Sequence, residues 1–364
     1  MTLERQLRFW LGALAGFVLF LWLFKGVLLP FVAGIALAYL LDPVADRLEN
    51  WGFSRGVAAL TIVLAIFIGL VVGLILVVPL LGHQLSGLVE RLPTLFARLQ
   101  ELVGPYFDGE LRKLLGGDVK SLEGGMQTAL SQGAGWITKL LQSLWNGGQA
   151  IASVVSILVI APVVAAYMLV DWDRMIAGLD DWVPPRHRDT VRLLAGRMND
   201  AVSGFVRGQV SVCVVMGIYY GLGLALVGLE FGLLIGLMSG LLGIVPYVGF
   251  GSGLVVGLIV ALVQYWPDWH GLALVAAIFA GGQALESYVL TPSWVGRSVG
   301  LHPVWLLFSL FAFGSLFGFV GMLVAVPTSA AIGVLARFSV EQYLASPLYL
   351  GEPAASDPVE TRDG

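Results

Sequence analysis

Residues 271–290 read GLALVAAIFAGGQALESYVL, an apolar run with a single charged residue, Glu286. About twenty apolar residues are enough for a helix to cross the hydrocarbon core of a bilayer. The run therefore predicts a transmembrane helix. An ionisable side chain at membrane depth is costly and usually has a function. Glu286 is accordingly the first candidate for a functional residue.

The composition extends this prediction to the whole chain. Of its 364 residues, 58% are hydrophobic and 12% are charged, and the mean hydropathy is +0.88. Soluble domains carry about twice that charged share, roughly 25%. Long apolar runs without strand-like alternation favour a helical bundle over a β-barrel. We expect an all-α polytopic membrane protein with the lipid bilayer as its first partner.

Several classes of function are disfavoured by the sequence. The net charge of −4 gives no indication of nucleic-acid binding. The single cysteine, Cys213, excludes an intramolecular disulfide and is interpreted as a packing residue, and the four histidines are scattered, so we predict no metal site. Walker A, H-E-x-x-H and dinucleotide-binding patterns are absent. We expect no cofactor.

One pattern associated with catalysis occurs. Residues 296–300 read GRSVG, which matches G-x-S-x-G, and His302 follows. A nucleophile elbow needs a strand before it and a helix after it, and no strand is expected in this chain. We interpret the pattern as a flexible loop and predict that the protein is not an enzyme. An intramembrane hydrolase that uses Ser298 and His302 is the alternative.

The chain divides by composition into five regions. They are three membrane segments in 1–82, an extramembrane helical insert in 83–149, a fourth membrane segment and a cytoplasmic amphipathic helix in 150–207, a transport core in 208–345, and a disordered tail in 346–364. The amphipathic stretch 186–207 is expected to lie along the membrane surface, separate from a fifth span at 210–229. Arginines in the short loops and at the ends place both termini in the cytoplasm.

Two apolar blocks in the proposed core, 231–266 and 301–336, are too long for one crossing. The predicted breaks are Pro246 and Gly249 in the first block, and Gly318, Gly321 and Pro327 in the second. Proline removes an amide donor and glycine loosens the helix. We expect two interrupted helical hairpins, the kind of element that carries substrate sites in secondary transporters.

Glycines recur every four residues on both arms of the first block. They stand at positions 232, 236 and 240, and again at 249, 253 and 257. This spacing places them on one face of each arm. Small residues at such positions let helix backbones approach closely within the membrane. We therefore expect tight packing of this hairpin.

Polar residues surround Glu286 in the sequence. Gln283 shares its helix face and Ser287 follows it. A carboxyl group that binds and releases a proton as a cavity opens to either side suits a proton-coupled carrier, whereas the alternative is a structural carboxyl. Arg207 and Gln209 are candidates to bind an anionic group or to pair with Glu286. The alternative for Arg207 is an interfacial anchor.

Several blocks together resemble the autoinducer-2 exporter (AI-2E) family of bacterial transporters. They include PFVAGIALAYLLDPV from Pro30, APVVAAYMLVDWDRM from Ala161, ALESYVLTPSWVGRSVGLHPVWLLFSLF from Ala284, and GFVGMLVAVPTSAAIGVL from Gly318. The resemblance implies about eight membrane segments, a homo-oligomer that is expected to be a pentamer, and export of autoinducer-2 or, in some members, sodium/proton antiport. Many relatives carry Asn where this chain has Tyr288, a candidate substrate residue, and if that side chain contacts the substrate, we expect a different substrate here.

We therefore expect a secondary transporter of the bacterial inner membrane that exports a small polar solute resembling autoinducer-2. Proton coupling through Glu286 is a further hypothesis. The alternatives are a sodium or other cation/proton antiporter and, in another class, a non-transporting scaffold that acts through the insert at 83–149.

Overall fold

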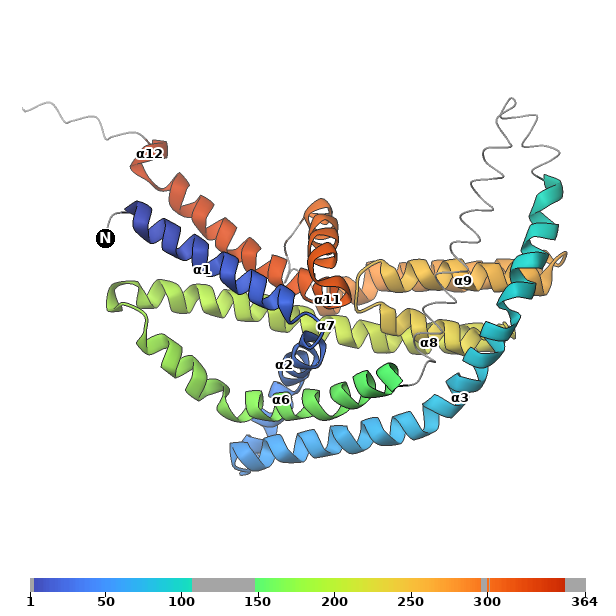
Figure 1. The fold of residues 1–364 in the computed structure, drawn as a ribbon, viewed down its shortest axis with the longest axis horizontal. Coiled ribbons are helices and arrows are strands. Elements are labelled where there is room, and N and C mark those ends of the chain that lie inside the picture. Colours follow the sequence, from blue (N-terminus) through green and yellow to red (C-terminus); the bar gives the residue numbers. More distant parts are fainter. Residues whose placement is uncertain (1–2, 107–147, 296–299, 301, 351–364) are drawn as a thin grey trace, which may run out of the picture.

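The computed structural model describes residues 3–106, 148–295, 300 and 302–350, and the regular elements in this part of the chain are all helical (Figure 1). They are α1 (Leu3–Leu23), α2 (Leu28–Asn50), α3 (Arg55–Tyr106), α6 (Gly148–Asp181), the 3-10 turn η2 (Pro185–His187), α7 (Arg188–Val227), α8 (Gly232–Leu242), α9 (Val248–Tyr265), α10 (Trp269–Leu285), the π-helix η3 (Glu286–Val295), α11 (Pro303–Leu344) and α12 (Pro347–Leu350). Among the described residues, seven helical segments are long and apolar enough to cross a membrane. The predicted all-α polytopic membrane protein is confirmed.

The buried apolar residues form two main clusters. One joins α2, the first half of α3 and α6. The other joins α7, α8, α9, α10, η3 and α11 with the second half of α3. Helix α3 contributes Ala59 and Ile62 to the first cluster, and Leu88 and Leu95 to the second. This long helix therefore connects an N-terminal bundle to the region predicted as the transport core.

Helix α3 joins the predicted third span to the beginning of the predicted insert without a break. Its 52 residues extend over roughly 78 Å at 1.5 Å per residue, far more than the hydrocarbon thickness of about 30 Å. The extension is attached to the start of α8. Arg91 pairs with Glu230 at 2.8 Å, and the Leu234 amide donates to the Gln84 side chain at 3.0 Å. The rest of the insert, 107–147, lies outside the described residues.

Helix α7 differs from our prediction for this region. The amphipathic stretch and the fifth span form a single helix, Arg188–Val227, rather than a surface helix followed by a crossing. The sequence of α7 contains no proline that would break it. Its N-terminal half also has a packing partner, because Ala201 is buried against Ala330 and Val334 of α11. The amphipathic stretch is therefore part of α7 and is packed against α11.

The first hairpin consists of α8 and α9, with Pro246 in the turn between them. A β-carbon at Gly236 would overlap the α7 backbone at Gly221, and one at Gly240 would overlap the α7 backbone at Gly217. A β-carbon at Gly249 would likewise meet backbone atoms of the other arm. The glycine spacing thus permits backbone contact both within the hairpin and with α7, as the sequence predicts.

The second hairpin lies within α11. The backbone leaves helical geometry at Gly318, where φ is 64° and ψ is −140°, a conformation that favours glycine. The arms fold back on each other, because Gly321 lies against Phe313 and Gly314 lies beside Met322. Pro327 remains inside the second arm and does not break it. Both predicted hairpins are therefore present.

The contact between α7 and α8 can be tested with Gly236→Ala. The added methyl group meets the α7 backbone, which cannot move as a flexible side chain would, so we expect destabilisation of about 1–3 kcal/mol. The measurement is the thermal unfolding midpoint of the detergent-solubilised protein. Gly251→Ala in α9 is the control, since nothing lies within 4 Å of a β-carbon there. Equal midpoints for the two variants would contradict the proposed contact.

Candidate functional site

A cavity of about 410 Å³ lies between α7, the first hairpin, the α10–η3 junction and the start of α11. Its described polar lining residues include Gln209, Cys213, Tyr220, Ser239, Gln283, Glu286, Ser287 and Thr291. Pro246 and Gly249 line it from the hairpin. A concave site with a few converging polar groups between interrupted helices is suited to bind a small polar solute.

Glu286 lies where the helix changes its hydrogen-bonding register. Helix α10 ends at Leu285, and the π-helix η3 begins at Glu286 and contains Pro292. Proline lacks the amide donor of a regular helix, and π-helical segments are frequent at functional sites. The half-buried Glu286 carboxyl group is thus presented to the cavity from an irregular part of the backbone.

Side-chain hydrogen bonds join neighbouring elements around the cavity. The Gln209 amide donates to the Gly243 carbonyl oxygen at 2.6 Å, in the turn after α8. The Gln283 amide donates to the Ser287 hydroxyl at 2.8 Å. Away from water, a backbone carbonyl group such as that of Gly243 needs a hydrogen-bond partner within the protein. Gln209 is buried at 8% exposure, and its amide supplies this partner.

Charge is distributed unevenly in this site. Of the cavity-lining residues that the structure describes, only Glu286 has a formal charge. The other polar lining groups are amides, hydroxyls and a thiol. A carboxylate in such surroundings repels anions and attracts cations, and the interaction is stronger than in bulk water because the effective dielectric constant is lower.

The structure brings together some of the predicted site residues and not others. Gln209, Gln283, Glu286 and Ser287 line the same cavity. Tyr288 does not, because its side chain is 82% exposed. Arg207 does not line it either, and Gly318, Gly321 and Pro327 of α11 are not among the described lining residues, although Val326 of the same helix is. Ser298 lies outside the described residues.

The prediction from sequence missed the cavity-lining face of α7. Cys213, Met216 and Tyr220 follow Gln209 at intervals of four, three and four residues, the spacing of one helix face. That signal was present in the sequence. The Tyr220 ring is buried against Phe279, with centroids 4.9 Å apart. Among the described residues, its hydroxyl group has no hydrogen-bond partner.

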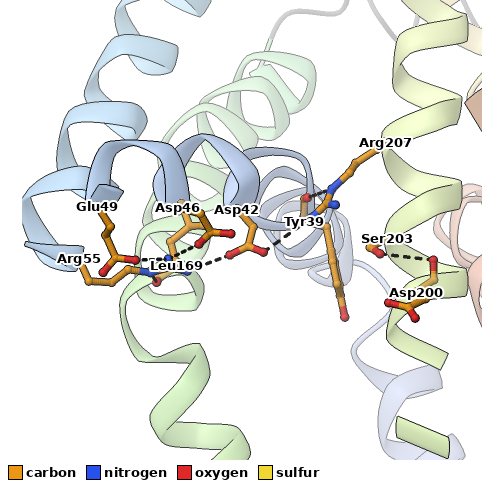
Figure 2. Close-up of polar contacts among 9 residues, drawn as sticks. All are labelled: Tyr39, Asp42, Asp46, Glu49, Arg55, Leu169, Asp200, Ser203 and Arg207. Carbon is orange, nitrogen blue, oxygen red and sulfur yellow. Dashed lines mark hydrogen bonds and ion pairs between the residues drawn. The ribbon is translucent and has the colours of Figure 1, made fainter. Parts of the chain in front are cut away.

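A second polar cluster holds the N-terminal bundle together (Figure 2). Arg55, at the start of α3, donates to Asp42 at 2.8 Å, to Asp46 at 2.6 Å and to Glu49 at 2.8 Å. Its Nε also donates to the Leu169 carbonyl of α6 at 2.8 Å. One guanidinium group therefore ties together α2, α3 and α6.

Arg207 belongs to the edge of this second cluster. Its Nε donates to the Tyr39 carbonyl oxygen at 2.8 Å, and its guanidinium group lies 3.6 Å from the Asp42 carboxylate (Figure 2). Both partners are on α2. Arg207 therefore connects α7 to the N-terminal bundle, and its described ion-pair partner is Asp42 rather than Glu286.

The family of the chain follows from its sequence. The AI-2E family transporter profile matches residues 11–340. The chain belongs to the AI-2E transporter family. "Putative transport protein YrrI" of Bacillus subtilis (strain 168) is 28% identical over 85% of this chain and 86% of its own length. "Putative permease PerM" of Escherichia coli (strain K12) is 29% identical over 87% of this chain and 88% of its own length.

Cys213 offers a direct test of the charge in the cavity of this AI-2E family member, because it is the only cysteine. We expect cationic 2-aminoethyl methanethiosulfonate to modify Cys213 faster than anionic 2-sulfonatoethyl methanethiosulfonate, with a ratio of about ten from one nearby carboxylate. Glu286→Gln should bring the ratio of the two modification rates close to the ratio that the same reagents show with a small thiol in solution. Modification rates can be followed by intact-protein mass spectrometry, and a ratio unaffected by Glu286→Gln would contradict this assignment.

The Arg55 cluster gives a stability prediction. Arg55→Met leaves three carboxylates without their shared cation, and the Arg55 side chain is only 20% exposed. Because the three carboxylates are partly exposed to solvent, we expect a loss of about 1–2 kcal/mol, measured by thermal unfolding. Arg174→Met is the control, because Arg174 is 87% exposed in its pair with Asp171 and should change stability by less than about 1 kcal/mol. Similar effects of the two substitutions would argue against this role of Arg55.

Proposed function

We propose that this protein is a secondary transporter whose solute passes through the cavity beside Glu286. The observation that carries the proposal is the position of this carboxyl group, which lines a polar cavity at the junction of α10 and η3. Family membership supports a transport function in general terms. Within that function, Glu286 is the residue that couples or binds the transported species.

The solute is a small polar molecule that is moved outward. The family resemblance implies export of autoinducer-2, which is a molecule of this kind. Amide and hydroxyl groups in the lining are suitable partners for the hydroxyl groups of such a molecule. Proton coupling through Glu286 is the finer part of this proposal. A carboxylate isolated from other charges is costly in a cavity at membrane depth, so binding of a proton or a cation relieves that cost.

A cation/proton antiporter is the second candidate, and one specific observation favours it. Glu286 is the only formally charged residue among the described lining residues, so a sodium ion and a proton would compete for the same carboxylate. Competition of this kind is sufficient for exchange if the cavity opens alternately to the two sides. The scaffold alternative places the activity instead in the insert at 83–149, most of which lies outside the described residues.

We further propose that the protein lies in the bacterial inner membrane with both termini in the cytoplasm, in accord with the positions of the arginines. We also propose that it forms a homo-oligomer, and the family resemblance leads us to expect a pentamer. Helix α1 is compatible with such an assembly, because large apolar side chains such as Phe9, Trp10 and Leu23 are more than 60% exposed. In a bilayer these side chains face lipid or another copy.

Sealed liposomes that contain an internal pH dye provide the test. We expect an imposed sodium or potassium gradient to drive proton flux in the wild type, or counterflow of a small hydroxylated solute such as D-ribose to be measurable. Glu286→Gln should abolish the coupled flux, since the amide has no titratable proton. Glu230→Gln is the matched control, because Glu230 pairs with Arg91 outside the cavity.

The outcomes separate the alternatives. Proton flux that depends on a cation gradient and on Glu286 supports the antiporter. Solute counterflow that depends on Glu286, without cation exchange, supports the exporter. Equal flux in the wild type and in Glu286→Gln would exclude Glu286 as the coupling residue. Ser298→Ala should leave transport unchanged, whereas a hydrolase would lose its activity.

A further inference from the structure

A second large cavity is a groove between α1 and α11. It measures about 520 Å³. Its described lining consists of apolar side chains, namely Leu11, Leu14, Ala15, Val18, Leu19 and Trp22 of α1 with Leu316 and Phe317 of α11. Helix α1 and the hairpin of α11 can both be followed in Figure 1. Empty apolar cavities do not hold ordered water, so the groove calls for an apolar occupant.

The length of the groove fits one leaflet of a bilayer. The α1 residues that line it recur at intervals of three and four, so they form a single stripe along the helix. From Leu11 to Trp22 this stripe extends over roughly 16 Å at 1.5 Å per residue. Half of a hydrocarbon core of about 30 Å is close to the same length. One acyl chain lying along α1 would therefore cover the stripe.

A cation lies at one end of the groove. The Lys25 ammonium group is 5.2 Å from the centroid of the Trp22 ring, and Trp22 is the last lining residue of α1. Lys25 is in the turn that follows α1, between two apolar segments. Tryptophan and lysine are typical of the membrane interface, where phospholipid headgroups lie. The polar end of the groove is thus placed for a phosphate group.

We propose that this groove binds a phospholipid, with an acyl chain between α1 and the α11 hairpin and its phosphate on Lys25. The apolar lining, the length of the stripe and the charge at its end select this occupant together. The acyl chain of the lipid would contact Leu316 and Phe317, directly before the break at Gly318. The lipid would therefore connect α1, whose large apolar side chains are widely exposed, to the tip of the second hairpin.

The test is retention of phospholipid by the purified protein. The protein is reconstituted in vesicles of phosphatidylethanolamine and phosphatidylglycerol, extracted in mild detergent, and analysed by native mass spectrometry. Ala15→Trp fills the groove, and Lys25→Gln removes the cation. We expect Lys25→Gln to weaken retention about fivefold, the effect of losing one basic contact with a headgroup. Ala15→Trp should displace the lipid.

Ala13→Trp is the matched control, because Ala13 is exposed on the same helix but does not line the groove. Helical content by circular dichroism verifies that each variant folds. Equal lipid retention in all four proteins would overturn the proposal. Unchanged retention together with an altered oligomeric state in Ala15→Trp would also overturn it, and would assign the groove to a second copy of the chain. Preferential loss of phosphatidylglycerol over phosphatidylethanolamine in Lys25→Gln would identify the anionic lipid as the preferred occupant.

Discussion

Backbone contact between α7 and α8 is the constraint on which the candidate site depends. Lipid provides no hydrophobic force to press helices together, so close packing has to come from shape. Glycine at positions 217 and 221 of α7, and at 236 and 240 of α8, removes the side chains that would keep the two backbones apart. The turn of the first hairpin is thereby held against α7. The cavity beside Glu286 is the space that remains between these elements and the α10–η3 junction.

An interrupted helix in a membrane exposes backbone groups that need partners, and the site residues serve this need as well as any transport function. Gln209 is an example, because it supports the Gly243 carbonyl and also lines the cavity. Glu286 is different in kind. It lies at the change from α to π register, and its carboxyl group faces the cavity.

The sequence alone was sufficient for features that depend on local pattern. Apolar length identified the membrane helices, and glycine and proline identified both hairpins. Two features depended on partners that are remote in the chain. Arg207 binds the Tyr39 carbonyl, 168 residues away, and no local pattern indicates that contact. The N-terminal half of α7 packs against α11.

The two polar clusters are separated by helix geometry. Residues two apart on a helix lie about 200° apart around its axis, so Arg207 and Gln209 cannot face the same space. Since Gln209 lines the cavity, Arg207 has to face elsewhere, and it contacts Asp42 and the Tyr39 carbonyl of α2. Arg207, two residues before the cavity-lining Gln209, is thus used to join α7 to the N-terminal bundle. Glu286 is the only formally charged residue in the described lining, and a proton or a cation that enters the cavity can neutralise it, which is the chemical basis of coupling in the proposed transporter.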